Sequence, residues 1–490
     1  MKKNLNSKSL SNKNFEEKTI CAISTPIGVG GIAIIRMSGS HSLEIANQIF
    51  LPFGKDKIAD NPRKLILGKL NAGTFEEKCL TVYFKNPFSY TGEDMVEFQC
   101  HGGTAVAEGV LKACVNAGAG LAEAGEFTKR AFINGKVSLD EAEGVIDVIN
   151  AESESEIKAG YGLVAGNLKK QIEEIQERLT TILAKIEVTI DYPEEELEQE
   201  TAQDALSELK LVLSDLNKIK ENSEVGVKLK SGYRVSIIGK TNVGKSSLLN
   251  AMLNFDKAIV TNIQGTTRDL VEDMYVFNGV KFILTDSAGI RETDDVVEKI
   301  GVEKSKKLLT ESDIVLFVVD GSEDIQNEDI AILSQLSDKN AILVVNKSDL
   351  FDKFKTENQF SKVWNGKKIF ISAKNKENIT TLKSMIFNML IDNKILNSNI
   401  LLTNVRHINL INDAIKFVNQ SIDAINNNMS LDMVSIDIQN VWNSLGEITG
   451  TSNTDEIINT IFSKFCVGKW FELYMAVCIK IYLVYTTLGA

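Results

Sequence analysis

The sequence contains few cysteines, and it has fewer positively than negatively charged residues. Six cysteines occur in 490 residues, and none forms a Cys-x-x-Cys pair, which argues against a zinc site or a thioredoxin-like redox motif. We therefore expect reduced, buried thiols. Lysine and arginine total 54 against 66 aspartate and glutamate residues, for a formal net charge of −12. This negative net charge argues against non-specific nucleic-acid binding by the protein as a whole. Any RNA contact therefore has to come from a local positively charged patch.

The chain also lacks a long uninterrupted hydrophobic run. Residues 1–18 are polar and rich in Asn, Lys and Ser. They have no apolar core of a secretory signal, which indicates a disordered extension. Near the C-terminus, the apolar stretch 475–485 is too short for a membrane span and is interrupted by Lys480. We therefore expect a cytoplasmic protein without stable membrane association, and we interpret residues 470–490 as an atypical apolar tail.

The clearest functional signal is a phosphate-binding loop at residues 239–246. Its sequence, GKTNVGKS, matches the pattern G-x-x-x-x-G-K-[ST] and stands between a predicted strand and a predicted helix. The backbone N–H groups of such a loop face a polyphosphate at a helix N-terminus. Lys245 is predicted to reach the β- and γ-phosphates, and Ser246 to bind Mg²⁺. The alternative is an ordinary glycine turn between a strand and a helix.

Three later motifs favour a nucleotide site over a simple turn. Residues 286–289 (DSAG), 346–349 (NKSD) and 372–374 (SAK) each follow an apolar run, and the carboxyl ends of parallel strands form one crevice. Asp286 is predicted to face Mg²⁺, Asp349 to pair with the N1–H and amine of guanine, and residues 372–374 to complete the base pocket. Adenine is disfavoured because Asp349 would meet the acceptor N1 of adenine, so the predicted nucleotide is GTP.

The predicted GTP contacts belong to the phosphate-binding loop, to residues 261–267 and to the three later motifs. They are Asn242, Val243, Gly244, Lys245, Ser246, Ser247, Thr261, Asn262, Ile263, Gln264, Gly265, Thr266, Thr267, Asp286, Ser287, Ala288, Gly289, Asn346, Lys347, Ser348, Asp349, Ser372, Ala373 and Lys374.

The usual residue for orienting the attacking water is missing. Ile290 stands where small regulatory GTPases carry Gln, and its side chain cannot hydrogen-bond to water. The role therefore falls to a nearby carboxylate. The candidates are Glu292, Glu298, Asp294 and Asp295.

Hydrolysis also needs a cation that neutralises the negative charge developing between the β- and γ-phosphates. Arg268 or Arg291 could act as an arginine finger, and each could equally form a surface ion pair. Alternatively, the amide oxygen of Asn242 could hold a monovalent metal ion together with backbone carbonyls of residues 261–267, while Thr267 binds Mg²⁺. The residues alone leave both possibilities open.

The flanking segments predict further domains. Residues 19–136 are predicted to be mixed α/β and to begin with a β-hairpin. The turn of this hairpin, residues 28–31, resembles a dinucleotide-binding loop. Such a loop is followed by a helix, whereas a strand follows this one, so the dinucleotide interpretation fails. Apolar residues at helical spacing fill residues 137–229 and 391–469. Between them, residues 230–390 carry the nucleotide motifs. We predict one helical domain built from both blocks with the G domain inserted, the alternative being two separate halves.

One stretch within the first helical block is strongly acidic. Residues 194–200 (EEELEQE) follow Pro193. Because clustered charges favour solvent, we predict a solvated interhelical loop here.

Several stretches outside the nucleotide motifs point to one family. They are residues 25–36, 89–94, 97–103, 125–132, 265–269 and 465–469. With these stretches and the split helical domain, the chain to residue 469 resembles the MnmE (TrmE) family of tRNA-modification GTPases. It departs from the family at Thr241, where proline is common, and in residues 470–490, which follow the usual C-terminal Cys-x-Gly-Lys motif.

The resemblance implies an architecture and a reaction. The fold would combine an N-terminal α/β folate-binding domain, a discontinuous all-helical domain and an inserted P-loop G domain with a parallel sheet. The protein would form a homodimer through its N-terminal domains. With a flavin-dependent partner of the MnmG (GidA) type, in a heterotetramer, it would add an aminomethyl or carboxymethylaminomethyl group to the wobble uridine of certain tRNAs. The donor would be 5-formyl-tetrahydrofolate or a related one-carbon tetrahydrofolate.

The resemblance also assigns roles to matching positions, including activation by K⁺ through G-domain dimerisation. The implied K⁺ ligands are Asn242, Thr261, Ile263 and Thr266; the Mg²⁺ ligands are Ser246 and Thr267; the catalytic residues are Glu298, Lys245 and Asn242; and the folate contacts are Arg36, Glu97, Lys136 and Lys469. Without the family, Arg36 and Glu97 could equally form a structural ion pair, and Lys136 could be a surface lysine.

Two other classes of protein carry the same nucleotide motifs. An Era- or Der-like switch for ribosome assembly would need a KH-type RNA-binding domain or a second G domain, and the sequence contains neither pattern. A structural GTPase that polymerises through its helical domain is the third alternative. Both are less consistent with the sequence than the modification enzyme.

Overall fold

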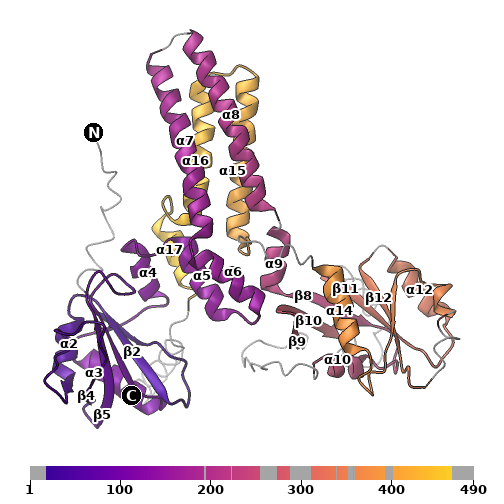
Figure 1. The fold of residues 1–490 in the computed structure, drawn as a ribbon, viewed down its shortest axis with the longest axis horizontal. Helices are drawn as coiled ribbons and strands as arrows, with labels where there is room; N and C mark the ends of the chain where they lie inside the picture. The colour runs from indigo at the N-terminus through magenta and orange to yellow at the C-terminus, as the bar shows by residue number, and fades with distance from the viewer. Residues whose placement is uncertain are drawn as a thin grey trace, which may run out of the picture. The chain divides into compact units, whose positions relative to one another are not determined.

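The computed structural model describes residues 18–192, 195–221, 223–253, 273–286, 311–337, 339–350, 357, 359–391 and 401–465. The chain divides into two compact units, Met1–Glu143 with Thr449–Ala490, and Gly144–Ile448. Figure 1 shows both units with their elements labelled.

The first unit is built on a seven-stranded sheet of order β3-β4-β5-β6-β2-β1-β7. Its strands are β1 (Ile20–Ile23), β2 (Ile32–Ser38), β3 (Phe50–Pro52), β4 (Ile66–Asn71), β5 (Glu76–Phe84), β6 (Met95–His101) and β7 (Gly120–Leu121). Its helices are α2 (Ser42–Ile49), α3 (Thr104–Asn116), α4 (Glu126–Ile133), the start of α5 (Leu139–Asn150) and α17 (Asp455–Phe462). The predicted hairpin is confirmed, because β1 and β2 pair antiparallel.

Residues of α2 and α3 join the core of this sheet, together with inward-facing strand residues such as Ile35 and Phe98. Four cysteines belong to the same core, and they are buried and free, as predicted. Burial raises the pKa of the Cys21 and Cys79 thiols to about 12, so these side chains behave as small apolar residues.

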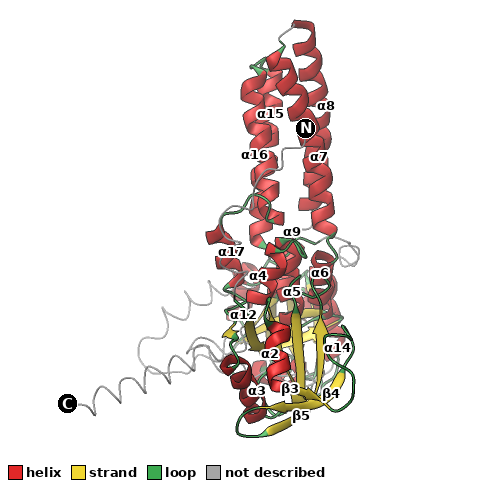
Figure 2. Ribbon diagram, turned by 90° about the vertical axis from the view of Figure 1, so that its left-hand side faces the viewer, coloured by secondary structure: helices red, strands yellow, loops and turns green. Residues whose placement is uncertain are grey.

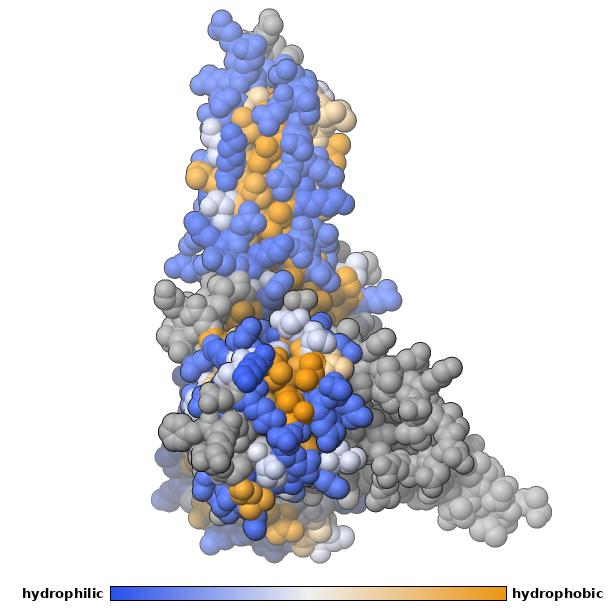
Figure 3. Space-filling view, turned by 90° about the vertical axis from the view of Figure 1, so that its right-hand side faces the viewer, coloured by the Kyte–Doolittle hydropathy of each residue, from blue (hydrophilic) through white to orange (hydrophobic). Residues whose placement is uncertain are grey.

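The helical part of the second unit contains α6 (Glu154–Val164), α7 (Asn167–Asp191), α8 (Glu195–Lys220), α9 (Ser223–Ser231), α15 (Val405–Asn426) and α16 (Leu431–Thr449). The long helices α7, α8, α15 and α16 run side by side (Figures 1 and 2). Ile172 and Leu209 from the first block share one core with Val418 and Leu445 from the second. Both blocks therefore build a single helical domain, as predicted. Along the bundle, apolar residues lie between hydrophilic ridges (Figure 3).

The prediction of an acidic interhelical loop is wrong for most of that run, because α8 begins at Glu195. Glutamate has a good intrinsic helix propensity. Negative side chains are also stabilised near a helix N-terminus, where the helix dipole is positive. The charges that suggested a loop therefore favour the start of a helix.

The G domain has a six-stranded sheet of order β13-β12-β11-β8-β10-β9. Its strands are β8 (Tyr233–Ile238), β9 (Asp273–Phe277), β10 (Val280–Asp286), β11 (Ile314–Asp320), β12 (Ala341–Asn346) and β13 (Lys367–Phe370), and its helices are α10 (Lys245–Leu253), α12 (Asn327–Gln335) and α14 (Ile379–Leu390). Only the pair β9–β10 is antiparallel among these described strands.

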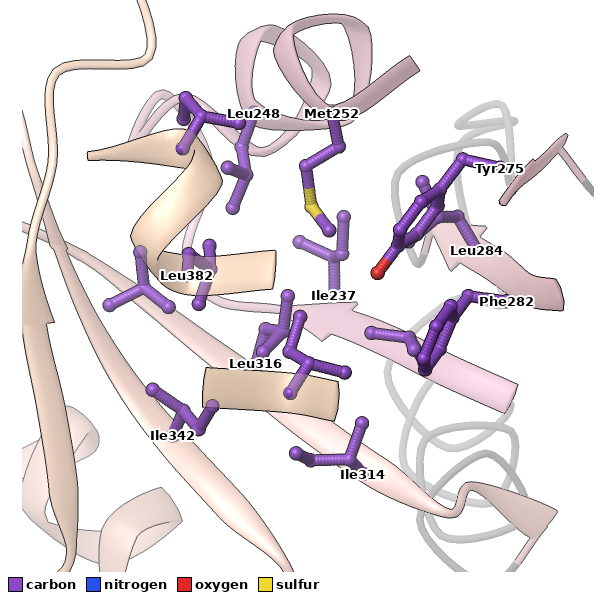
Figure 4. Packing of buried hydrophobic residues seen from close by; sticks show 14 of the residues in the cluster. Ile237, Leu248, Met252, Tyr275, Phe282, Leu284, Ile314, Leu316, Ile342 and Leu382 are labelled. Atoms are coloured by element: carbon purple, nitrogen blue, oxygen red, sulfur yellow. The ribbon is translucent and has the colours of Figure 1, made fainter. Parts of the chain in front are cut away.

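Helices cover both faces of this sheet. Leu248 and Met252 of α10 and Leu382 of α14 pack on one face (Figure 4). Leu333 of α12 and Trp364 pack on the other. Because both faces are covered, the central strands are continuous apolar runs rather than alternating ones.

The two ends of the inserted domain lie together. An ideal Cβ at Gly226, in α9, would come within 2.3 Å of the Leu402 carbonyl oxygen. Gly226 precedes β8 and Leu402 follows α14 along the chain, so the chain leaves and rejoins the helical domain at one place. This contact is what the insertion of a compact domain requires.

Candidate functional site

The phosphate-binding loop connects β8 to α10, as predicted. An ideal Cβ at Gly239 would lie 2.3 Å from the Val318 carbonyl oxygen, and one at Gly244 would lie 2.3 Å from Asn346 Nδ2. Gly244 also has φ +95°, a conformation that disfavours other residues. The two glycines therefore let the loop pass close to β11 and to the end of β12.

Lys245 is buried at the start of α10. Its Nζ donates hydrogen bonds to the carbonyl oxygens of Gly239, at 2.8 Å, and Lys240, at 2.6 Å. Both acceptors belong to the loop itself. The ammonium group is thereby held above the loop that is predicted to receive phosphate, where it can interact with an anion.

Asn346 ties the motifs to one another. Its Nδ2 donates to the Val243 carbonyl at 2.8 Å, and its Oδ1 accepts from the Ala373 N–H at 3.0 Å. The side chain is buried, so both bonds are shielded from water. Asn346 thus joins the phosphate-binding loop, the end of β12 and residues 372–374.

Asp349 is exposed and follows the carboxyl end of β12, three residues after Asn346. The Ser372 hydroxyl donates to Asp349 Oδ1 at 2.7 Å. This bond and a backbone N–H hold the pKa of the Asp349 carboxyl below its usual range. The group is therefore an ionised acceptor at neutral pH, as recognition of two guanine donors requires.

Lys347 lies two residues before Asp349 in the chain and has φ +64°. Its Nζ forms an ion pair with Asp320, at the end of β11. Burial raises the pKa of Asp320, but hydrogen bonds from Lys347 and Ser322 outweigh it and leave that pKa lowered. Asp320 is not among the residues predicted from the sequence, although its place at the carboxyl end of a parallel strand is a usable signal.

The remaining predicted GTP residues are placed as follows. Asn242, Ser246, Ser247 and Lys374 are exposed, and Val243, Ser348, Ser372 and Ala373 are buried. Asp286 ends β10, where its backbone pairs with Ile237 of β8. The residues that lie outside the described part are Thr261, Asn262, Ile263, Gln264, Gly265, Thr266, Thr267, Arg268, Ser287, Ala288, Gly289, Ile290, Arg291, Glu292, Asp294, Asp295, Glu298 and Lys469.

The first unit brings Arg36 and Glu97 together. They are cross-strand partners on β2 and β6, with Arg36 Nε 2.8 Å from Glu97 Oε1. The Arg36 guanidinium also lies over the rings of Tyr90, at 5.4 Å, and Phe127, at 5.7 Å. Lys136 donates from Nζ to the Pro87 carbonyl at 3.2 Å. Of the three predicted folate residues in the described part, Glu97 therefore belongs to the segment 87–97, and Arg36 and Lys136 contact it.

A buried arginine that the sequence analysis missed holds this segment. Arg130 is 2% exposed and pairs with Glu126 at 2.7 Å and Glu93 at 3.1 Å. Ser38 also donates to Glu93, at 2.7 Å. Because charged groups are seldom buried without partners, this network fixes the position of residues 89–94.

The C-terminal segment returns to the same unit. Phe462 packs on Phe132 with ring centroids 6.1 Å apart. An ideal Cβ at Gly125 would lie 2.8 Å from both the Phe462 carbonyl oxygen and Phe465 Cβ. The described chain therefore ends, at Phe465, against the start of α4.

Comparison with known proteins identifies the family. The model of the MnmE helical domain matches residues 139–466, and that of the GTP-binding protein TrmE N-terminus matches residues 19–136. The tRNA modification GTPase MnmE of Clostridioides difficile is 42% identical over 459 residues, which cover 93% of this chain and 100% of that protein. The MnmE protein of Acetivibrio thermocellus is 42% identical over 460 residues, with the same coverage.

The chain belongs to the MnmE family of tRNA modification GTPases. As a member of the MnmE family it is a GTP hydrolase, and its fold is the α/β, helical and G-domain combination that the sequence predicted. A solved structure of an Aquifex aeolicus Era variant bound to GDP·AlF₄⁻ overlaps 38% of this chain and 66% of that chain, with 28% identity and a TM-score of 0.27. Within the described residues, no helix has the length and apolar character needed to cross a membrane.

The substitution Asp349→Asn tests the base pocket. It should weaken GTP binding by about 100-fold or more, because an amide places a donor against the donors of guanine. The same variant should gain affinity for xanthosine triphosphate, whose C2 carbonyl accepts from an amide. Titration with fluorescent nucleotides measures both, with Asp324→Asn, an exposed site in the same domain, as the control. Unchanged affinity for GTP would contradict the assigned role.

Proposed function

We propose that this chain is a K⁺-activated GTPase that, with an MnmG-type flavoprotein, adds an aminomethyl or carboxymethylaminomethyl group to the wobble uridine of certain tRNAs. One observation carries the proposal: a guanine-nucleotide loop system and a TrmE-type N-terminal domain occur in one chain. The first can bind and hydrolyse GTP. The second holds a preformed arginine and aromatic cluster suited to a one-carbon tetrahydrofolate.

The position of Asn242 supports a role for K⁺. Asn242 lies exposed in the phosphate-binding loop, before the buried Val243, and its φ is +64°. Its side-chain amide oxygen is a hard ligand suited to an alkali cation beside the phosphates. Thr261, Ile263 and Thr266 would supply the remaining oxygens. Ser246 and Thr267 would hold Mg²⁺, and Glu298 would orient the attacking water.

The outer face of the N-terminal sheet supports a homodimer. Leu67 of β4 and Leu80 of β5 are cross-strand partners on the face opposite the core, and they are 45% and 36% exposed. Ile32 of β2 is 65% exposed on the same face. Exposed apolar residues gathered on one sheet face are typical of a protein interface. Two chains joined there would form the centre of the proposed heterotetramer with the flavoprotein.

The Arg36 cluster supports binding of the one-carbon donor. The guanidinium lies beside two aromatic rings and beside Glu97. A tetrahydrofolate offers a flat pterin that can stack on aromatic rings, and ring N–H groups that a carboxylate can accept. Glutamyl carboxylates of the donor would pair with Lys136, and Lys469 would reach the donor from the C-terminal motif.

The K⁺ requirement is testable by ion replacement. GTP hydrolysis should rise by about 10-fold or more when Na⁺ is replaced by K⁺, because the larger ion fits the oxygen cage and neutralises developing charge. Asn242→Ala and Asn242→Gly should both lose this response. The glycine variant is the informative one, because it removes the oxygen without straining a backbone of positive φ.

Asn242→Asp is the matched control, because it retains a side-chain oxygen at the same position. Steady-state phosphate release in each salt provides the measurement. Equal rates in Na⁺ and K⁺ for the unaltered protein, or a full K⁺ response in Asn242→Gly, would rule out this part of the proposal.

The donor site is testable by isothermal titration with 5-formyl-tetrahydrofolate. Arg36→Ala should weaken binding by about 10-fold or more, since it removes a charge that is held against the two rings. Arg63→Ala is the control: Arg63 also lies over an aromatic ring, that of Phe88, at 5.0 Å, and it is not one of the proposed contacts. The absence of binding heat in the unaltered protein would refute the donor site.

The biological reaction is testable in cells that lack the gene. Mass spectrometry of tRNA wobble nucleosides should show loss of the aminomethyl and carboxymethylaminomethyl uridines. A wild-type copy should restore them, whereas a Lys245→Ala copy should not, because Lys245 is needed to bind the phosphates. Unchanged wobble nucleosides in the deletion strain would overturn the proposed function.

A further inference from the structure

The hairpin β9–β10 joins the two segments that are predicted to contact Mg²⁺ and GTP. Residues 254–272, which contain Thr266 and Thr267, precede β9, and β10 ends at Asp286. Between the strands, Asn278 and Gly279 both have positive φ, at 48° and 76°, as in the tight turns of two-residue hairpins. Along the chain, this hairpin is therefore the described element that adjoins both segments.

The tip of the hairpin is hydrogen-bonded to the helical domain. The Gly279 carbonyl accepts from the Ser155 N–H, in the first turn of α6, at 3.0 Å. The first N–H groups of a helix have no partner within the helix, so the hairpin supplies one. An ideal Cβ at Gly279 would lie 3.3 Å from Glu154 Cβ, which shows how closely the turn approaches α6.

A buried ion-pair network strengthens this contact. Lys281 Nζ lies 3.1 Å from Glu152 Oε2 and 3.1 Å from Glu156 Oε1. Lys281 and Glu156 are each 8% exposed. Glu156 also accepts from the Ser153 hydroxyl at 3.0 Å and from the Glu152 N–H at 3.0 Å. The acceptors are therefore fixed by the start of α6, and removing one partner would leave a buried charge unpaired.

The same strand leads from this network to the nucleotide site. β10 pairs in parallel with β8 from Phe282↔Tyr233 to Asp286↔Ile237. β8 continues directly into the phosphate-binding loop. Lys281 is thus at the helical-domain end of β10, and Asp286 is at its nucleotide end.

A second ion pair lies beside Lys281. A cavity of about 170 Å³ beside it is also lined by Glu156, Lys230, Asp147 and Thr403. Lys230 Nζ pairs with Asp147 Oδ1 at 2.7 Å across the same space. The two ion pairs therefore border one cavity but keep separate partners.

We propose that the β9–β10 hairpin, anchored on α6 by Gly279 and Lys281, couples the nucleotide state of the G domain to the helical domain. Lys281 is a positioning residue in this device, because it touches α6 rather than the nucleotide. The inference rests on GTP binding and hydrolysis, and it is independent of the proposed tRNA, folate and K⁺ chemistry.

Hydrogen–deuterium exchange of the full-length protein tests the coupling. Adding a non-hydrolysable GTP analogue should change the exchange rate of peptides covering residues 152–160 by about fivefold or more, the usual scale of coupling between sites. Lys281→Met should abolish this change and leave the affinity for the analogue intact. Lys281→Arg, which keeps the charge, should restore it. Lys230→Met is the matched control, because it breaks the neighbouring ion pair without altering β10, and should retain the change.

A double variant guards against a merely local loss of stability. Glu156→Gln combined with Lys281→Met leaves no unpaired buried charge at α6, and it should lose the exchange response as Lys281→Met does. An unchanged α6 in the analogue-bound wild-type protein, or a full response in Lys281→Met, would overturn the inference. Failure of the analogue to bind, measured separately by fluorescence titration, would overturn the nucleotide site itself.

Discussion

The nucleotide site depends on one buried side-chain amide. Asn346 donates to the phosphate-binding loop through Val243 and accepts from the base-recognition loop through Ala373. These loops come from distant parts of the chain, and the two hydrogen bonds hold them at a fixed separation. A buried amide that lost either partner would incur the cost of an unsatisfied polar group. The spacing between the phosphate-binding loop and the predicted base pocket is therefore held by contacts within the protein, which would reduce the ordering needed on GTP binding.

Much of the G domain could be predicted from sequence because its signals are local. The apolar runs before Asp286 and Asn346 mark strands β10 and β12, and the glycines at 239 and 244 mark the loop. The helical domain could also be predicted, since both blocks carry an apolar stripe that needs a partner. In each case the pattern within a short window is sufficient.

Contacts between distant segments could not be predicted in this way. Nothing near Lys281 indicates that its partners are Glu152 and Glu156, and nothing near Arg130 indicates Glu93. These pairs exist because the fold brings separate segments together. The prediction for the acidic run at the start of α8 failed for another reason. The charges were interpreted as a sign of solvation, whereas the electrostatics of a helix N-terminus also favour them.

The contact between Gly226 and Leu402 also limits how the G domain can move. The two segments that connect the G domain to the helical domain lie together and form a narrow neck. The G domain can therefore rotate about this neck, but it cannot move away from it. The contacts of Gly279 and Lys281 with α6 lie close to this neck, because Leu229 of α9 and Thr403, the neighbour of Leu402, line the same cavity as Lys281 and Glu156. The attachments of the G domain to the helical domain are therefore concentrated at one place, and a small rotation about that place would produce the largest displacement at the edge of the domain farthest from it.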